Sequence, residues 1–133
     1  GWSYGGYMSS LAMFKGEGIF KAAIAVAPVT NWRFYDTIYT ERYMALPQEN
    51  SSGYDDNSPV SHSQKLQGNY LLIHGTGDDN VHFQNAVTLQ NKLIAEGKQF
   101  DSFYYPDRAH GIFRKSARPH LFTMMTDWVL ENL

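Results

Sequence analysis

The sequence contains no cysteine, so disulfide bridges and thiolate metal sites are excluded. Cysteine usage therefore gives no indication of whether the protein works in an oxidising or a reducing compartment. It has no basic run, and its formal net charge is −2, which makes nucleic acid and anionic membranes poor candidate partners. No apolar run approaches the roughly 18 residues that a membrane-spanning helix needs. Hydrophobic residues make up 43% of the 133 residues and charged residues only 18%, which is typical of one modest globular domain.

Short apolar runs alternate with segments of helical periodicity along the chain. Buried strands are predicted at 22–27 and 69–74, and a third strand at 100–105. Helices are predicted at 4–14, 32–44, 81–96 and 116–133, and the polar stretch 48–69 is predicted to be loop with at most one short helix. Strands that alternate with helices predict an α/β fold, with a parallel sheet flanked by helices on both faces.

The chain opens with Gly1-Trp2-Ser3-Tyr4-Gly5-Gly6, which contains the pattern G-x-S-x-G. In the nucleophile elbow of an α/β-hydrolase, this pattern places a serine on a sharp turn between a strand and a helix. Both flanking glycines are expected to be required because a side chain there would collide with the turn or with neighbouring strands. Ser3 is therefore the predicted nucleophile. Since an elbow needs a strand before it, we expect the chain to be the C-terminal piece of a longer protein.

A serine hydroxyl needs a base to take its proton, and the base needs a carboxylate to orient it. In α/β-hydrolases the three residues follow the chain order Ser, Asp, His. Among the five histidines, only His110 lies in a tight loop after the last predicted strand, so it is the predicted base. Structural or solvated roles suffice for the others, which are His62, His74, His82 and His120.

Asp78 and Asp79 compete for the role of the carboxylate. Both follow the second predicted strand, and their spacing alone does not choose between them. Helix-capping logic makes Asp79 the better cap for the helix expected to begin near Val81. Asp107 is so close to His110 in sequence that we expect it to stabilise the loop instead.

These motifs closely resemble the C-terminal catalytic region of the prolyl oligopeptidase family of serine peptidases, and within it the dipeptidyl peptidase IV subfamily. The similarity extends over essentially the whole chain. It is carried by the elbow, Ala27-Pro28-Val29 with Trp32, Tyr39-Thr40-Glu41-Arg42-Tyr43-Met44, the loop 107–111 and above all His74-Gly75-Thr76-Gly77-Asp78-Asp79-Asn80-Val81-His82-Phe83-Gln84. That last string is long and specific.

The resemblance implies a catalytic triad of Ser3, Asp78 and His110, and so favours Asp78 over Asp79. It implies that Tyr4 supplies a donor of the oxyanion hole. The residues that match the walls of a pocket for a proline ring are Tyr4, Val29, Trp32, Tyr35, Tyr39 and Val81, and Asn80 matches a residue that hydrogen-bonds the substrate backbone. Without the family match, the helical spacing of three of these aromatic residues would favour packing in the core.

The resemblance implies a serine exopeptidase that releases N-terminal dipeptides after proline or alanine through an acyl-enzyme, without a cofactor or a metal. Its implied partners are peptides with Pro or Ala at the second position, and a homodimer through the hydrolase domain is compatible with it. The compartment stays open, because the family includes periplasmic, cell-surface, secreted and cytoplasmic members.

The family's β-propeller, its upstream hydrolase strands and its second oxyanion donor are not among these 133 residues. We therefore expect residues 1–133 to be the C-terminal portion of the hydrolase domain and to be inactive by themselves. Two alternatives stay open: a tripeptidyl, acylaminoacyl or endo-acting peptidase of the same family, and a catalytically silent homologue that acts as a binding module.

Overall fold

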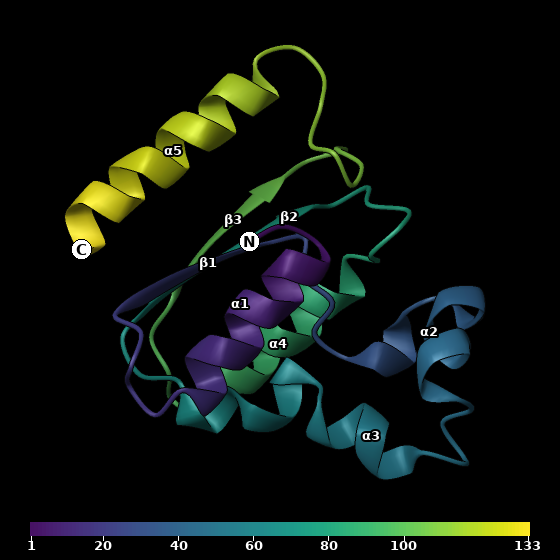
Figure 1. Cartoon of the computed structure of the whole chain (residues 1–133). Coiled ribbons are helices and arrows are strands. Elements are labelled where there is room, and N and C mark those ends of the chain that lie inside the picture. The colour runs from purple at the N-terminus through teal and green to yellow at the C-terminus, as the bar shows by residue number, and fades with distance from the viewer.

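A three-stranded parallel sheet forms the centre of the computed structural model, which describes residues 1–133 (Figure 1). The strands are β1 (Ala22–Val26), β2 (Asn69–Gly75) and β3 (Asp101–Tyr105), and their order in the sheet is β1-β2-β3. On the outer side of β1, Trp2 adds a single parallel bridge to Val26. The predicted parallel sheet is confirmed, and the first residues of the chain run alongside it.

Helices cover both faces of this sheet, as the alternating pattern predicts. Helices α1 (Tyr4–Lys15) and α4 (Gln84–Ala95) lie on one face, and α5 (Ala117–Asn132) lies on the other (Figure 1). None of the helices combines the length and the apolar character needed to cross a membrane. Because the strands are parallel, their carboxyl ends meet at one edge of the sheet, which is where α/β proteins have their active sites.

The alternation of side chains along β2 divides the core into two layers. Tyr70 and Leu72 pack with residues of α1 and α4, whereas Leu71 and Ile73 pack with residues of α5 such as Leu121. Because both faces of β2 are buried, this strand is a continuous apolar run with no polar alternation. The central strand β2 is thus packed on both faces, so the loop that follows its carboxyl end is attached to a rigid element.

The segment between β1 and β2 forms a separate group of short helices beside α1 and α4 (Figure 1). They are η1 (Trp32–Phe34), α2 (Thr37–Met44), α3 (Ser51–Asp56) and η2 (Pro59–Lys65). The prediction of one continuous helix over 32–44 is wrong, and 48–69 contains two helical segments where at most one was expected. The break comes from Asp36, which is extended and accepts a hydrogen bond from the Tyr39 N–H (2.8 Å), so that it caps a new helix.

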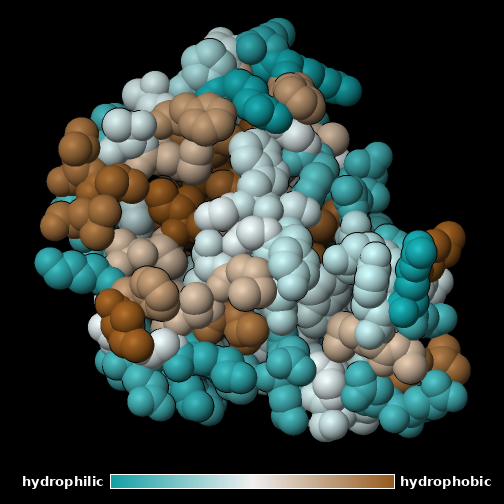
Figure 2. Space-filling view, viewed as in Figure 1, coloured by the Kyte–Doolittle hydropathy of each residue, from teal (hydrophilic) through white to brown (hydrophobic).

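Apolar side chains gather on the side of the molecule where β1 and α5 lie, as the brown surface of Figure 2 shows. A groove of about 480 Å³ opens there, and the apolar residues that line it include Trp2, Ile24, Val26, Phe122, Met125, Val129 and Leu130. Beyond β1, the sheet is extended only by residues 1–3, through the bridge at Trp2 and a hydrogen bond from the Gly1 amine to the Ile24 carbonyl (2.7 Å). This face is distinct from the strand ends that carry the predicted site.

Candidate active site

Ser3 lies at the turn between the bridge at Trp2 and the start of α1. Its backbone has φ 56° and ψ −119°, a combination that non-glycine residues rarely adopt. Its N–H donates to the Val26 carbonyl (2.8 Å), which ties the turn to the end of β1. The Ser3 hydroxyl makes no capping hydrogen bond to α1. A strained turn that leaves its hydroxyl unengaged is the geometry expected of a nucleophile elbow.

The two flanking glycines of the motif, Gly1 and Gly5, differ in the space that a side chain would find there. A Cβ on Gly1 would collide with the Gly5 carbonyl, as expected. A Cβ on Gly5 would meet nothing within 4 Å, so the expectation that Gly5 is needed for space is wrong. Gly6 is the second crowded position, because a Cβ there would lie 2.9 Å from the Val26 carbonyl oxygen. The tight contact with β1 therefore falls one residue later than the motif suggests.

The loops that follow β2 and β3 lie against each other. The Gly77 N–H donates to the Arg108 carbonyl (3.1 Å), and the Asp107 N–H donates to Thr76 Oγ1 (2.9 Å). A Cβ on Gly75 would collide with the Arg108 carbonyl, so only glycine permits this close approach. These backbone contacts bring the loop with Asp78 beside the loop with His110.

Asp78 and His110 form a direct contact between these loops. His110 Nδ1 lies 2.8 Å from Asp78 Oδ2. The Asp78 side chain has no solvent exposure, whereas the His110 side chain is 22% exposed. The carboxylate thus lies beneath the imidazole, and the imidazole stays accessible from the surface. This is the relative placement that an orienting acid and a general base require.

Asp78 also caps its own turn, because Oδ1 accepts from the N–H groups of Asn80 (3.0 Å) and Val81 (2.9 Å). The prediction that Asp79 is the cap is wrong. Asp79 is exposed and its side chain makes no hydrogen bond, and α4 begins only at Gln84. Asp78 both caps the turn and contacts His110 because its two oxygens face different partners. The spacing of residues along the chain does not reveal this arrangement.

The electrostatics of Asp78 favour its ionised form. Burial alone raises the pKa of the carboxyl group, but hydrogen bonds from His110, His74 and the Asn80 backbone outweigh it. The net effect holds the pKa of Asp78 well below its usual range. Asp78 is therefore a permanent anion at any pH near neutrality, ready to stabilise a positive imidazolium.

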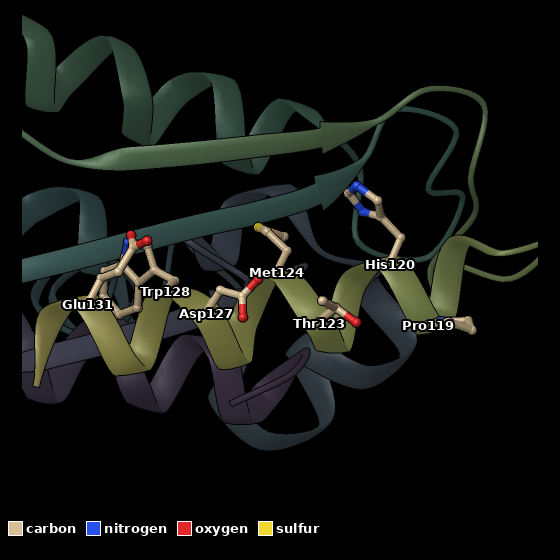
Figure 3. A pocket seen from close by; sticks show the side chains of 7 residues that line it. All are labelled: Pro119, His120, Thr123, Met124, Asp127, Trp128 and Glu131. Atoms are coloured by element: carbon tan, nitrogen blue, oxygen red, sulfur yellow. The ribbon is translucent and has the colours of Figure 1, made fainter.

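The remaining histidines lie away from this contact or are buried beneath it. His62 Nε2 is bonded to the Asp56 carbonyl (2.7 Å), His82 is exposed, and His74 is fully buried. His120 pairs through Nδ1 with the Tyr105 hydroxyl (2.8 Å). Figure 3 shows His120 at one end of a groove along α5 whose lining includes none of the predicted site residues. Histidine, aspartate and glutamate side chains nowhere form a group of three that could hold a metal ion.

Two residues that the sequence reasoning missed connect the elbow to the histidine loop. The indole Nε1 of Trp2 donates to the His110 carbonyl (3.1 Å), and Arg118 Nε donates to the Gly111 carbonyl (2.8 Å). The Arg118 guanidinium also lies over the Trp2 ring at 4.9 Å. These contacts tie the residue before Ser3 to the histidine loop, and no hydrogen bond joins the Ser3 and His110 side chains. Trp2 could have been suspected from its place in the motif, but nothing in the sequence marks Arg118.

Tyr4 is the first residue of α1, so its N–H has no acceptor within the helix. The next N–H, of Gly5, is already used by the Trp2 carbonyl (2.8 Å). A helix start also carries a partial positive charge that favours an anion. The Tyr4 N–H is therefore a free donor directly beside Ser3, where an oxyanion would form.

An aromatic pocket of about 410 Å³ opens beside the elbow, with Trp32 at its centre. Tyr39 stacks on Trp32 with centroids 6.1 Å apart and planes at 20°, and Tyr35 meets the same indole edge-on. Tyr7, which the sequence reasoning missed, lines the pocket and lies edge-on to Trp32 at 5.0 Å. Tyr4 completes the group at 6.2 Å from the indole.

The other predicted pocket residues lie around and behind these rings. Val29 and Val81 are buried in the same apolar cluster as Trp32. The Tyr35 hydroxyl donates to Asn80 Oδ1 (2.7 Å), which orients the amide while its N–H₂ group stays available. Of the residues predicted to line a proline pocket, Tyr4, Trp32 and Tyr39 line this pocket, Val29 and Val81 are buried, and Tyr35 and Asn80 line a separate hollow. A mostly apolar, aromatic space suits a compact apolar ring.

Comparison with known proteins gives a consistent result. The sequence model of the prolyl oligopeptidase family matches residues 1–133. The chain is 46% identical to dipeptidyl peptidase 4 of Bos taurus and 45% identical to prolyl endopeptidase FAP of Mus musculus, each over 134 aligned residues. These alignments cover 98% of the chain but only 18% of each relative.

The fold agrees equally well with a solved structure. The crystal structure of Porphyromonas gingivalis dipeptidyl peptidase 4 matches the whole chain with a TM-score of 0.99 and 46% identity, and the match covers 19% of that protein. A family match over the full length, together with a near-identical backbone, leaves no competing assignment. By sequence and by fold, this chain belongs to the prolyl oligopeptidase family.

Proposed function

We propose that this chain is the C-terminal catalytic part of a longer serine peptidase that releases N-terminal dipeptides after proline or alanine. The observation that carries the proposal is the 2.8 Å contact between His110 Nδ1 and the buried Asp78, beside a serine on a strained elbow. The aromatic pocket next to that serine suits the residue before the cleaved bond. The match to about 18% of the length of its relatives supports a role as one part of a larger enzyme.

In the proposed reaction, Ser3 Oγ attacks the carbonyl carbon that follows the proline ring, and His110 Nε2 accepts the hydroxyl proton. The carbonyl π bond opens, and the negative charge on its oxygen is stabilised by the Tyr4 N–H. His110 then donates the proton to the leaving amine as the peptide bond breaks, which leaves an acyl-enzyme. Water, deprotonated by His110, hydrolyses this ester and returns Ser3 to its starting state.

The resemblance does not separate dipeptidyl from endo-acting peptidases, because the identities to dipeptidyl peptidase 4 and to prolyl endopeptidase FAP differ by one per cent. An endopeptidase is therefore the second candidate. A homodimer through this region stays a prediction, as does the absence of a cofactor.

A substrate panel on the full-length protein tests the choice. We expect the fastest release of chromophore from Gly-Pro and Ala-Pro substrates with a free amino terminus. The same dipeptides with an acetylated amino terminus should react much more slowly. Fast cleavage of the blocked substrates would favour the endopeptidase. No reaction with any substrate or with a fluorophosphonate probe would favour the silent homologue.

Replacement of Tyr39 by alanine tests the pocket. Its ring is 39% exposed and stacks on Trp32, so its loss removes one wall without opening the core. We expect kcat/KM for Gly-Pro substrates to fall roughly 5-fold, mainly through KM, because an aromatic contact of this kind contributes about 1 kcal/mol. The matched control is Ile38→Ala, on the same helix and 87% exposed, which should leave both constants unchanged. Equal effects of the two changes would contradict the pocket assignment.

A further inference from the structure

His74 is a buried ionisable residue that the proposed mechanism does not use. It lies in β2, with no exposed surface, four residues before Asp78. Its Nε2 is 2.8 Å from the Val81 carbonyl oxygen and 3.3 Å from Asp78 Oδ2. His110 Nδ1 contacts the same carboxylate oxygen. Two imidazoles, one from the central strand and one from the loop after β3, thus meet at one atom of Asp78.

The surroundings of the His74 ring indicate which nitrogen carries its proton. The Val81 carbonyl and the Asp78 carboxylate can only accept hydrogen bonds, so Nε2 carries the proton, which it donates to the Val81 carbonyl with Asp78 Oδ2 alongside. Nδ1 is buried without any hydrogen-bond partner, and a second proton there would lack an acceptor. Phe83 packs edge-on against the ring at 5.7 Å and offers no polar group. His74 therefore directs its Nε2–H toward the Val81 carbonyl and the Asp78 carboxylate.

With His74 included, the Asp78 carboxylate has four donors. Oδ1 accepts from the backbone N–H groups of Asn80 and Val81, Oδ2 accepts from His110, and His74 Nε2 lies 3.3 Å from Oδ2. An ionised carboxylate offers about four lone-pair positions, so each has a donor. Because the Asp78 side chain is fully buried, water does not replace a donor that is removed. The His74 contact is thus one of four that fix the orientation of this carboxylate.

We propose that His74 is a positioning residue for the Asp78 carboxylate, a role that rests on the proposed peptidase function. Anchored on the Val81 carbonyl, it holds Asp78 in the rotation that presents Oδ2 to His110 Nδ1. Strand β2 pairs with β1 on one side and β3 on the other, so the imidazole approaches from a rigid base. His74 touches neither the predicted nucleophile nor the pocket rings, and it acts through Asp78.

Two substitutions in the full-length protein separate this role from a purely structural one. His74→Leu keeps the volume but removes the donor, whereas His74→Gln keeps an N–H close to the place of Nε2. We expect the leucine variant to lower kcat for Gly-Pro substrates roughly 10- to 100-fold with little change in KM, and the glutamine variant to recover most of the loss. A rise in KM with kcat unchanged would overturn the proposal, because it would indicate an effect through Val81 at the pocket.

A double-mutant cycle tests whether the effect passes through Asp78. In an Asp78→Asn background, His74→Leu should cause no further loss of kcat or of the rate of fluorophosphonate labelling. A loss as large as in the wild type would overturn the proposal.

Thermal unfolding shows whether each variant is folded, and His74→Met replaces the leucine variant if the latter is not. Failure of both to fold, with the glutamine variant folded, would reduce His74 to a structural residue and overturn the proposal. An active wild type with an unaffected leucine variant would refute this role alone. An inactive wild type would refute the proposed function as well.

Discussion

Replacement of Ser3 by alanine in the full-length protein is expected to lower kcat for Gly-Pro substrates by roughly 10⁴- to 10⁶-fold, because it removes the proposed nucleophile. The fold should be retained, because the Ser3 hydroxyl makes no capping hydrogen bond and the N–H bond to Val26 does not depend on the side chain. The backbone at Ser3 has positive φ, which costs alanine and serine about the same. Chromogenic assays and fluorophosphonate labelling measure the loss.

Ser9→Ala is the matched control for this experiment. Ser9 lies in the same helix that begins at Tyr4, and its side chain makes no hydrogen bond to another residue. The control should label and turn over at the wild-type rate. If the Ser3 variant still labels stoichiometrically, the nucleophile is a different residue and the proposed mechanism is wrong.

The second large effect is expected from Asp78→Asn. The asparagine Oδ1 can still accept from the Asn80 and Val81 N–H groups, so the turn should survive. The new amide N–H₂ would face His110 Nδ1, where the carboxylate oxygen had accepted a hydrogen bond. Nδ1 must then become the acceptor, which moves the ring proton to Nε2 and removes the base. We expect kcat to fall about 10⁴-fold, the typical loss when the histidine of a serine triad is held in the wrong tautomer.

Asp79 provides an unusually close control for this change. It is the adjacent carboxylate, it is exposed, and its side chain makes no hydrogen bond. Asp79→Asn should therefore leave kcat within about two-fold of wild type, because surface substitutions of this kind rarely have large effects. Thermal unfolding of both variants checks that a loss of activity is not a loss of fold. Equal activity of the two variants would rule out Asp78 as the partner of the base.

Much of the fold follows from periodicity in the sequence. The three predicted strands all form, although only β2 is buried on both faces and most of β3 is exposed, and long stretches with helical spacing became α1, α4 and α5. The prediction failed at 32–44, where the aromatic spacing is compatible with one helix but Asp36 interrupts it. A single capping residue can outweigh a periodic pattern. Whether an aspartate caps a helix or simply faces solvent depends on its three-dimensional surroundings, which the spacing of residues along the chain does not show.

The candidate site, like the fold, was predicted from the sequence only in part. Residue types, their order and the long string from His74 to Gln84 were sufficient to nominate Ser3, Asp78 and His110, since local motifs carry the chemistry. Nothing local nominates Arg118, which lies 115 positions after Ser3 and acts only through the Gly111 carbonyl and the Trp2 ring. Tyr7 was overlooked because helical spacing alone does not tell a pocket wall from a core residue.

From the order of its residues alone, the chain specifies a parallel α/β architecture, an elbow serine and the kinds of side chain that could assist it. Folding adds the contacts between residues far apart in sequence: the two oxygens of Asp78 assigned to different partners, the loops after β2 and β3 packed on each other, and the indole of Trp2 bonded to the histidine loop. Such contacts depend on distances and directions in three dimensions. They become visible only when the strands are in register and the helices are packed.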